Sequence, residues 1–191
     1  NNNLKNKNHD FNSNNAVLQD LLISFVETNF KNLFIYSSSI TVYGNVLKKE
    51  LVNENYKLNP VSSYGFSKLM AENQIEYFSN KFDLNSTVLR LCSIYGPGLK
   101  RQVVYKILKK SLTSKSITLY GNKKDKRQLL YVKDCAIMIY KLLKRKPLGF
   151  NIFNISGGKK IKIIDIIKIS NIILKKKTKY KFTNDLKNPI L

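Results

Sequence analysis

The heptapeptide Leu33-Phe-Ile-Tyr-Ser-Ser-Ser39 gives the first indication of the fold. Its four apolar and aromatic residues are too few for a helix and predict a short strand buried on both faces, as in a parallel sheet. Ser37, Ser38 and Ser39 then follow at the carboxyl end of that strand. Because open α/β sheets bind ligands outside the carboxyl ends of their strands, these serines are candidate site residues.

Helical and extended patterns alternate on both sides of this strand. Before it, apolar residues recur at helical spacing from Val17 to Val26, and Ser13 or Asn14 is placed to cap that helix. The other expected elements are helix 63–80, strand 86–91, helix 102–113, strand 116–120, a loop with Arg127, helix 132–144, strand 150–155 and helix 163–174, with no element after that. This alternation predicts the α/β class, with part of a doubly wound parallel sheet.

The polarity of the sequence divides the 191 residues into three parts. Residues 1–13 form a polar, low-complexity lead that has little to bury. Residues 14–95 hold the predicted sheet strands and their helices, and residues 96–191 are expected to form mostly a smaller lobe. A chain of this length provides one domain or slightly more.

The formal net charge is +22, from 34 Lys and Arg against 12 Asp and Glu. An excess of this size raises nucleic acid or an anionic membrane as a partner. Nearly all of it is lysine scattered along every segment, whereas proteins that read nucleic acid concentrate arginine and aromatic residues on one face. No stretch approaches the ~18 uncharged apolar residues of a membrane span. We therefore expect no nucleic-acid partner and no membrane partner.

Histidine and cysteine are too scarce for most metal and redox chemistry. His9 is the sole histidine, and Cys92 and Cys135 lie far apart without a CxxC pair. This composition predicts no metal site and a reducing, cytoplasmic location. A general acid or base must then be a Tyr, Lys, Asp, Glu or Cys side chain.

Tyr64 and Lys68 stand one turn apart at the start of the predicted helix 63–80, so their side chains share one face. A free tyrosine ionises near pH ~10, and an ammonium group within a few ångströms favours the phenolate. Such a pair can act as a general acid and base at neutral pH. The spacing also occurs by chance, but here the pair opens the helix that follows the serine-ended strand, so these features can meet at one crevice.

Four stretches of the chain, taken together, resemble the extended short-chain dehydrogenase/reductase family of NAD-dependent nucleotide-sugar epimerases and dehydratases. They are FIYSSSITVYG at 34–44, PVSSYGFSKLMAE at 60–72, LRLCSIYGPG at 89–98, and LYGN with RQLLYVKD within 119–134. The resemblance implies a Rossmann-type sheet with a substrate-binding lobe. Within the family it is closest to UDP-glucose 4-epimerases, because the 4,6-dehydratases carry acidic residues where this chain has Ile40 and Thr41.

The resemblance also implies roles for individual residues. Tyr64 would take the proton from a sugar hydroxyl, Ser39 would hydrogen-bond that oxygen, and Lys68 would hold the nicotinamide ribose; these three are the expected catalytic residues. The expected cofactor is NAD, contacted by Asn14, or its neighbour Asn15, and by Ser39, Tyr64, Lys68 and Cys92. The expected substrate is a nucleotide sugar, in the first place a UDP-sugar, contacted by Ser39, Tyr64, Ser93 and Arg127, with Arg127 clamping the diphosphate.

The glycine fingerprint of the family's cofactor-binding turn, GxGxxG or GxxGxxG, does not occur in the 191 residues. The sequence is therefore expected to be an N-terminally truncated form of such an enzyme. Three hypotheses remain: a truncated nucleotide-sugar 4-epimerase, a related NAD(P)-dependent reductase or dehydratase, and a non-catalytic remnant that binds a nucleotide sugar. The resemblance is compatible with a homodimer. The sugar, the nucleotide and the choice between NAD and NADP stay open.

Overall fold

The computed structural model describes residues 15–46, 52–100, 102–120, 122 and 125–183, so Asn14 lies outside the described residues. The chain groups into two compact units, one of residues 1–92 with 137–155 and one of residues 93–136 with 156–191. This division differs from the expected boundary between residues 95 and 96, because the strand at 150–155 pairs within the sheet of the first unit.

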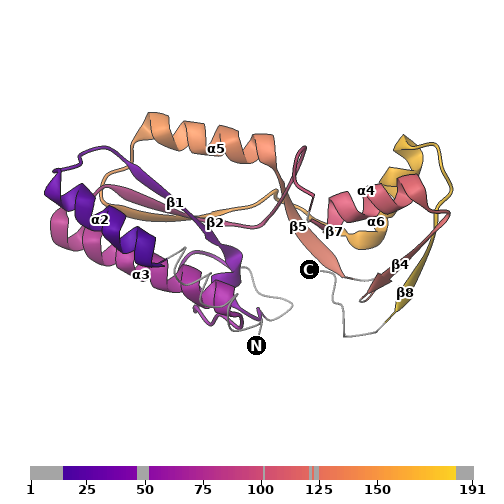
Figure 1. The fold of residues 1–191 in the computed structure, drawn as a ribbon, viewed down its shortest axis with the longest axis horizontal. Coiled ribbons are helices and arrows are strands. Elements are labelled where there is room, and N and C mark those ends of the chain that lie inside the picture. The colour runs from indigo at the N-terminus through magenta and orange to yellow at the C-terminus, as the bar shows by residue number, and fades with distance from the viewer. Residues whose placement is uncertain (1–14, 47–51, 101, 121, 123–124, 184–191) are drawn as a thin grey trace. The chain divides into compact units, whose positions relative to one another are not determined.

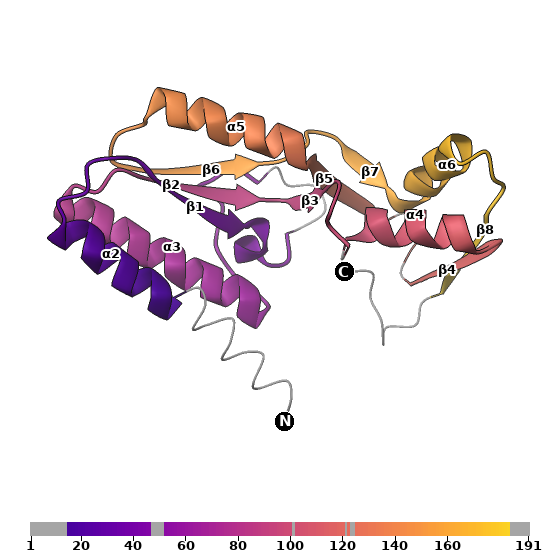
Figure 2. The same ribbon diagram turned by 45° about the horizontal axis from the view of Figure 1, so that its top comes forward.

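The first unit contains a three-stranded parallel sheet in the order β1-β2-β6 (Figure 1). Its strands are β1 (Phe34–Ser39), β2 (Ser86–Leu91) and β6 (Phe150–Ile155). Helices α2 (Val17–Glu27) and α3 (Ser63–Phe82) cover one face, and α5 (Val132–Arg145), from Ile137 onward, covers the other (Figure 2). Helices on both faces of a parallel sheet form the doubly wound arrangement that the sequence predicts.

The core of this unit lies between the sheet and the helices α2 and α3. Leu22, Ala71, Ile75 and Val88 are completely buried there. The buried positions of α3 recur at helical spacing, and β2 is buried at its first five positions, as expected for a central strand. This packing holds α3 firmly against β1 and β2.

β1 is longer and more exposed than the sequence predicts. It runs to Ser39, because all six of its residues pair with β2, and the three serines are therefore part of the strand. Most of its residues are half-buried, since β1 lies at one edge of the three described strands. Residues Ile40–Tyr43 then form a short 3-10 helix, η2. In α2, the N-cap is Ala16 without a side-chain hydrogen bond, and the predicted caps Ser13 and Asn14 lie outside the described residues.

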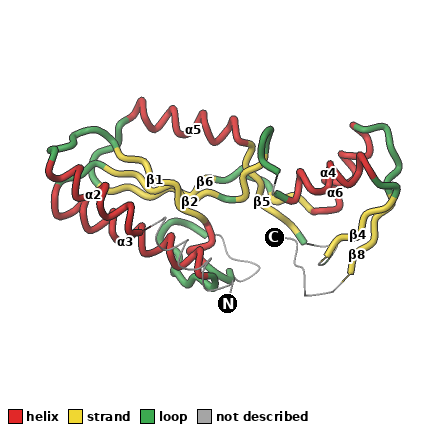
Figure 3. The backbone as a smooth tube through the Cα atoms, in the orientation of Figure 1, coloured by secondary structure: helices red, strands yellow, loops and turns green. Residues whose placement is uncertain are grey.

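The described residues of the second unit form two small sheets and two complete helices, and the first turn of α5 also belongs to this unit (Figure 3). β3 (Ser93–Tyr95), β5 (Lys126–Tyr131) and β7 (Lys160–Lys162) form one sheet, and β4 (Ser116–Tyr120) pairs in parallel with β8 (Lys179–Thr183). The helices α4 (Val103–Thr113) and α6 (Ile163–Ile173) pack on each other, and their shared core includes Ile107 and Ile167.

Two sequence predictions for this unit are wrong. Arg127 lies in strand β5 and not in a loop, because the strand pairs with β7 at this position. A strand, β8, follows the last helix, where the sequence predicts no element. Its residues alternate lysine with aromatic side chains, Lys179-Tyr-Lys-Phe-Thr183, but the lysine run that precedes it hides this short pattern.

Two chemical features concern only the part of the chain that the structure describes. None of its helices combines the length and the apolar character that crossing a membrane requires. Its His, Cys, Asp and Glu side chains form no group of three that could hold a metal ion. Cys92 and Cys135 are both buried.

Candidate active site

The N-terminus of α3 is fixed by a side-chain cap and by a glycine. Ser62 precedes the helix in an extended conformation, and its Oγ accepts a hydrogen bond from the backbone N of Gly65 at 3.0 Å. A Cβ on Gly65 would lie 2.7 Å from the carbonyl oxygen of Thr41, so glycine is needed for the helix to pack this closely against η2. The first turn of α3 is thereby held next to the residues that follow Ser39.

Ser39 joins the end of β1 to η2. Its Oγ accepts hydrogen bonds from the backbone N of Thr41 at 3.2 Å and from the Thr41 hydroxyl at 3.0 Å. A serine hydroxyl can accept two hydrogen bonds and donate one. Because Thr41 occupies the acceptor positions, the Ser39 hydroxyl is left to donate its own proton, which suits it to binding a substrate oxygen.

Lys68 places its ammonium group close to two tyrosine rings. The Nζ atom donates to the Ser37 carbonyl and to the Tyr36 hydroxyl, at 3.1 Å each, and lies 5.9 Å from the centre of the Tyr64 ring. Lys68 is 8% exposed, whereas Tyr64 is 41% exposed. The cation is thus held at the carboxyl end of β1, beside a tyrosine that a substrate can reach. In the first unit, Lys68 and Tyr64 of α3 thus lie beside β1, the strand that ends at Ser39.

Tyr36 is a member of this site that the sequence analysis missed. Burial raises the pKa of the Tyr36 hydroxyl well above its usual range, and the negative charges of the Tyr64 phenolate and the Glu72 carboxylate raise it further. Tyr36 therefore keeps its proton, and its hydroxyl accepts the hydrogen bond from Lys68. In the sequence, Tyr36 looks like an ordinary core residue because it stands in an apolar run.

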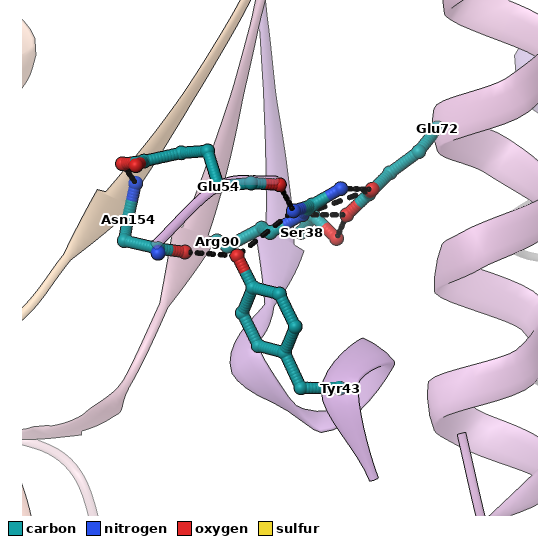
Figure 4. Close-up of polar contacts among 6 residues, drawn as sticks. All are labelled: Ser38, Tyr43, Glu54, Glu72, Arg90 and Asn154. Carbon is teal, nitrogen blue, oxygen red and sulfur yellow. Dashed lines mark hydrogen bonds and ion pairs between the residues drawn. The ribbon is translucent and has the colours of Figure 1, made fainter. Parts of the chain in front are cut away.

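The sequence analysis also did not identify the buried ion pair between Glu72 and Arg90, which Figure 4 shows. Glu72, one turn further along α3, pairs with Arg90 of β2 with 2.7 Å between Oε2 and Nη2, and it accepts a hydrogen bond from the Ser38 hydroxyl. Burial by itself lowers the pKa of Arg90, but its hydrogen bonds to Glu72 and Tyr43 and their charges outweigh burial and leave that pKa raised. Arg90 therefore keeps its positive charge. The position of Glu72 one turn beyond Lys68 could have indicated that its side chain lies on the same face of the helix as Lys68.

The same arginine ties the segments around the site together (Figure 4). Arg90 Nη1 donates to the Tyr43 hydroxyl at 2.8 Å and to the Glu54 carbonyl at 2.9 Å. The Tyr43 hydroxyl in turn donates to Asn154 Oδ1 at 2.7 Å, and the Asn154 backbone N donates to the Glu54 carboxylate at 2.7 Å. One buried guanidinium thus links β2 to η2, to the loop before α3 and, through these, to β6.

The remaining predicted site residues are placed as follows. Cys92 is buried just after β2, in the first unit, and its backbone N is hydrogen-bonded to β6. Ser93 begins β3 and Arg127 lies in β5, and both are half-buried in the second unit. Asn14 lies outside the described residues, whereas its neighbour Asn15 is almost completely buried. Contacts of these residues with a cofactor or substrate remain predictions.

Comparison with known sequences agrees with the predicted family. A family model described as the NAD dependent epimerase/dehydratase family matches residues 2–156. An "uncharacterized UDP-glucose epimerase YtcB" of Bacillus subtilis (strain 168) is 27% identical over 154 residues, which are 80% of this chain and 48% of that protein. A dTDP-D-glucose 4,6-dehydratase of Dictyostelium discoideum is 28% identical over 169 residues, covering 83% of this chain and 39% of that protein. The chain thus spans about half of these relatives or less.

The fold is shared with solved structures. The crystal structure of UDP-glucuronic acid 4-epimerase from Bacillus cereus, in complex with NAD, superposes with a TM-score of 0.82 at 28% identity, over 90% of this chain and 56% of that one. The predicted Rossmann-type α/β class is therefore confirmed. Since the family model matches most of the sequence, the chain belongs to the NAD dependent epimerase/dehydratase family.

Proposed function

We propose that the chain carries the acid-base half of a nucleotide-sugar 4-epimerase that oxidises its substrate transiently to a keto-sugar. The observation that supports this most is the arrangement at the carboxyl end of β1. There the buried Lys68 ammonium lies 5.9 Å from the ring of the partly exposed Tyr64, next to the serine-ended strand. Such an arrangement suits removal of a proton from a hydroxyl of a bound sugar.

Each of the three side chains has a task that follows from its surroundings. Tyr64 Oη takes the proton of the sugar hydroxyl and returns it when the keto-sugar is reduced. The Ser39 hydroxyl, whose acceptor positions are occupied by Thr41, donates to the same sugar oxygen and holds it in place. Lys68 favours the phenolate form of Tyr64 by charge attraction, because its ammonium group is largely removed from water.

The chemistry of these donors fits the nicotinamide ribose of NAD. Lys68 and Tyr64 present an ammonium group and a phenol at a strand end, where ribose hydroxyls can be bound. NAD, when bound, supplies the hydride acceptor and donor that this side-chain set lacks. Asn14 and Cys92 are proposed as further cofactor contacts, and Ser93 and Arg127 as contacts of a UDP-sugar. We also keep as proposals a homodimer and a cytoplasmic location.

Dehydration is the second candidate, because one of the relatives is named as a 4,6-dehydratase. An elimination needs a carboxyl group placed to move protons at the sugar. The positions after Ser39 hold Ile40 and Thr41. Glu72 is engaged with Arg90, and the Glu54 carboxylate with the backbone of Asn154. These observations favour epimerisation.

Product analysis separates the two reactions. The protein that carries this chain would be incubated with NAD and, in turn, UDP-glucose, UDP-glucuronic acid and dTDP-glucose, and the products followed by NMR. We expect inversion at C4 with no net loss of water. A 4-keto-6-deoxy sugar as the product would show that the reaction is dehydration and not epimerisation. A tight nucleotide-sugar complex without turnover would favour the non-catalytic alternative, and unchanged affinity in Arg127→Ala would contradict the proposed diphosphate contact.

A further inference from the structure

Lys68 and Glu72 stand at positions where two opposite charges on a helix usually meet. They are four residues apart in α3, so their side chains share one face. A Lys68–Glu72 ion pair would draw the ammonium group along the helix, away from Tyr64, which precedes Lys68 by one turn. The location of the Lys68 charge therefore depends on what else binds the Glu72 carboxylate.

Arg90 and Ser38 together saturate that carboxylate. Arg90 Nε donates to Oε1 at 3.2 Å and to Oε2 at 3.1 Å, and Nη2 donates to Oε2 at 2.7 Å. The Ser38 hydroxyl donates to Oε1. Each carboxylate oxygen thus has two donors within hydrogen-bonding distance, and the single Nε–H of Arg90 is shared between the two oxygens, so three donor protons cover the carboxylate. The two side chains of the ion pair are only 2% and 3% exposed, so water does not compete for these positions.

The Lys68 side chain is directed away from Glu72, towards β1 and Tyr64. Its Nζ donates to the Ser37 carbonyl and the Tyr36 hydroxyl, both on β1, and faces the Tyr64 ring. Ser37 and Ser38 are successive residues of one strand, so their contacts hold Lys68 and Glu72 separately at neighbouring positions of β1. The carbonyl and the phenol that receive the ammonium group carry no formal charge while Tyr36 is protonated.

We propose that Arg90 is a positioning residue for the acid-base pair: by saturating Glu72, it prevents that carboxylate from capturing Lys68 and so keeps the Lys68 charge beside Tyr64. This inference rests on the proposed function of Tyr64 and Lys68, and it adds a task for a residue that is out of reach of the substrate. The fork geometry of arginine suits it, because one guanidinium can cover both carboxylate oxygens, which a lysine cannot do.

Among the residues that the structure describes, few other titratable groups face this region from the elements packed on α3, and the Glu54 carboxylate, on the loop before that helix, is bound by the backbone N of Asn154. β1 contributes Tyr36, whose raised pKa reflects burial first and then the charges of Tyr64 and Glu72. β2 contributes Arg90 itself, and η2 contributes Tyr43, which is hydrogen-bonded to it. The described carboxylates of α2, Asp20 and Glu27, are both exposed to solvent. The balance among Lys68, Arg90 and Glu72 therefore dominates the local charge.

The ionisation of Tyr64 in the chain itself tests the proposal without cofactor or substrate. Tyrosines labelled with ¹³C at Cζ would be titrated by NMR, and the Tyr64 signal assigned with Tyr64→Phe. We expect Arg90→Met to raise the pH at which Tyr64 ionises by about one unit, because the freed Glu72 attracts Lys68. The double variant Arg90→Met/Glu72→Gln should return it close to the parent value, since the competing charge is gone. Arg145→Met and Glu76→Gln, both at exposed positions, are the matched controls.

Each outcome decides between the proposal and a purely structural role. An unchanged titration in Arg90→Met, or a double variant that stays as high as the single one, would overturn it. Since Arg90→Met can fail to fold, Glu72→Gln provides a second test: because Arg90 already keeps Glu72 away from Lys68 in the parent chain, this substitution should not raise the pH of Tyr64 ionisation, and a rise would mean that Glu72 supports Lys68. Activity that survives Tyr64→Phe would refute the proposed function. The titrations would still test whether Arg90 positions Lys68, because they do not depend on activity.

Discussion

Two clusters of side chains involve one face of α3, where Glu72 follows Lys68 by one turn and Tyr64 by two, and they differ in their contact with water. The outer cluster, Ser39, Tyr64 and Lys68, includes a tyrosine that is 41% exposed. The inner cluster, Glu72 with Arg90, is 2–3% exposed and fully hydrogen-bonded. The outer cluster thus includes a side chain that water reaches, whereas the inner cluster is closed to water. Substitutions in the two clusters should therefore separate activity from stability.

The largest expected effect is on turnover, from the outer cluster. Tyr64→Phe removes one hydroxyl from a partly exposed side chain, so we expect activity to fall ~10²–10⁴-fold while the thermal unfolding midpoint changes little. Tyr77→Phe, at a 58% exposed tyrosine of the same helix, is the matched control and should keep full activity. Turnover and thermal unfolding would be measured on both variants. Comparable loss of activity in the two would remove the distinction between the clusters.

The inner cluster should show the opposite pattern. Glu72→Ala leaves the Arg90 guanidinium buried without its ion-pair partner, and we expect the free energy of unfolding to fall by about 3–5 kcal/mol. Glu76→Ala, one turn further along α3 at an exposed position, should change it by less than about 0.5 kcal/mol. Urea denaturation followed by circular dichroism measures both. Equal stability of the two variants would show that the buried pair does not hold α3.

Gly65 lies in the first turn of α3, and its close packing against η2 affects both the stability of the helix and the position of Tyr64. In Gly65→Ala the added methyl group would meet the Thr41 carbonyl at 2.7 Å and push the first turn of α3 away from η2. We expect a loss of about 1–3 kcal/mol in stability, together with reduced activity because Tyr64 moves. Ser63→Ala, at the exposed first position of α3, serves as control. Wild-type activity in Gly65→Ala would show that the close packing is not required.

The smallest effect concerns Tyr36 at high pH. Its pKa is raised in the folded chain above the ordinary tyrosine value of 10.0, so the folded state keeps a proton that the unfolded state loses. This contribution to stability is complete below pH 10 and is lost as the pH rises from there towards the folded-state pKa. Stability measured against pH should therefore fall less steeply above that point in Tyr36→Phe than in the parent chain, and an identical slope would contradict the assigned burial.

The sequence predicts the framework well where its patterns are strong. The strands at 86–91, 116–120 and 150–155 have the predicted bounds, because each is a short β-branched or apolar run with clear turns around it. β8 was missed because alternating lysines leave little hydrophobic signal, and Arg127 was placed in a loop because charged residues crowd its strand. In each case tertiary pairing, which local patterns do not encode, decides the structure.

The site was predictable only in part, for a physical reason. Tyr64 and Lys68 can be found because their spacing is a local feature of the chain, and the resemblance to the family singles out Ser39 among three successive serines. Tyr36 and Arg90 belong to the site through contacts between elements far apart in sequence, so a strand pattern shows them only as an aromatic and a charged residue. Arg90 in the middle of a buried strand was nevertheless a signal, since a central strand buries arginine only with a partner.

The central claim is that Lys68 and Tyr64 act as one acid-base unit, and the pH at which Tyr64 ionises tests it most directly. The measurement is the ¹³C NMR titration of Tyr64 in the parent chain, in Lys68→Met and in the exposed control Lys81→Met. The account predicts that Lys68→Met raises the ionisation pH by at least about one unit while Lys81→Met leaves it unchanged. An identical Tyr64 titration in all three chains would contradict it.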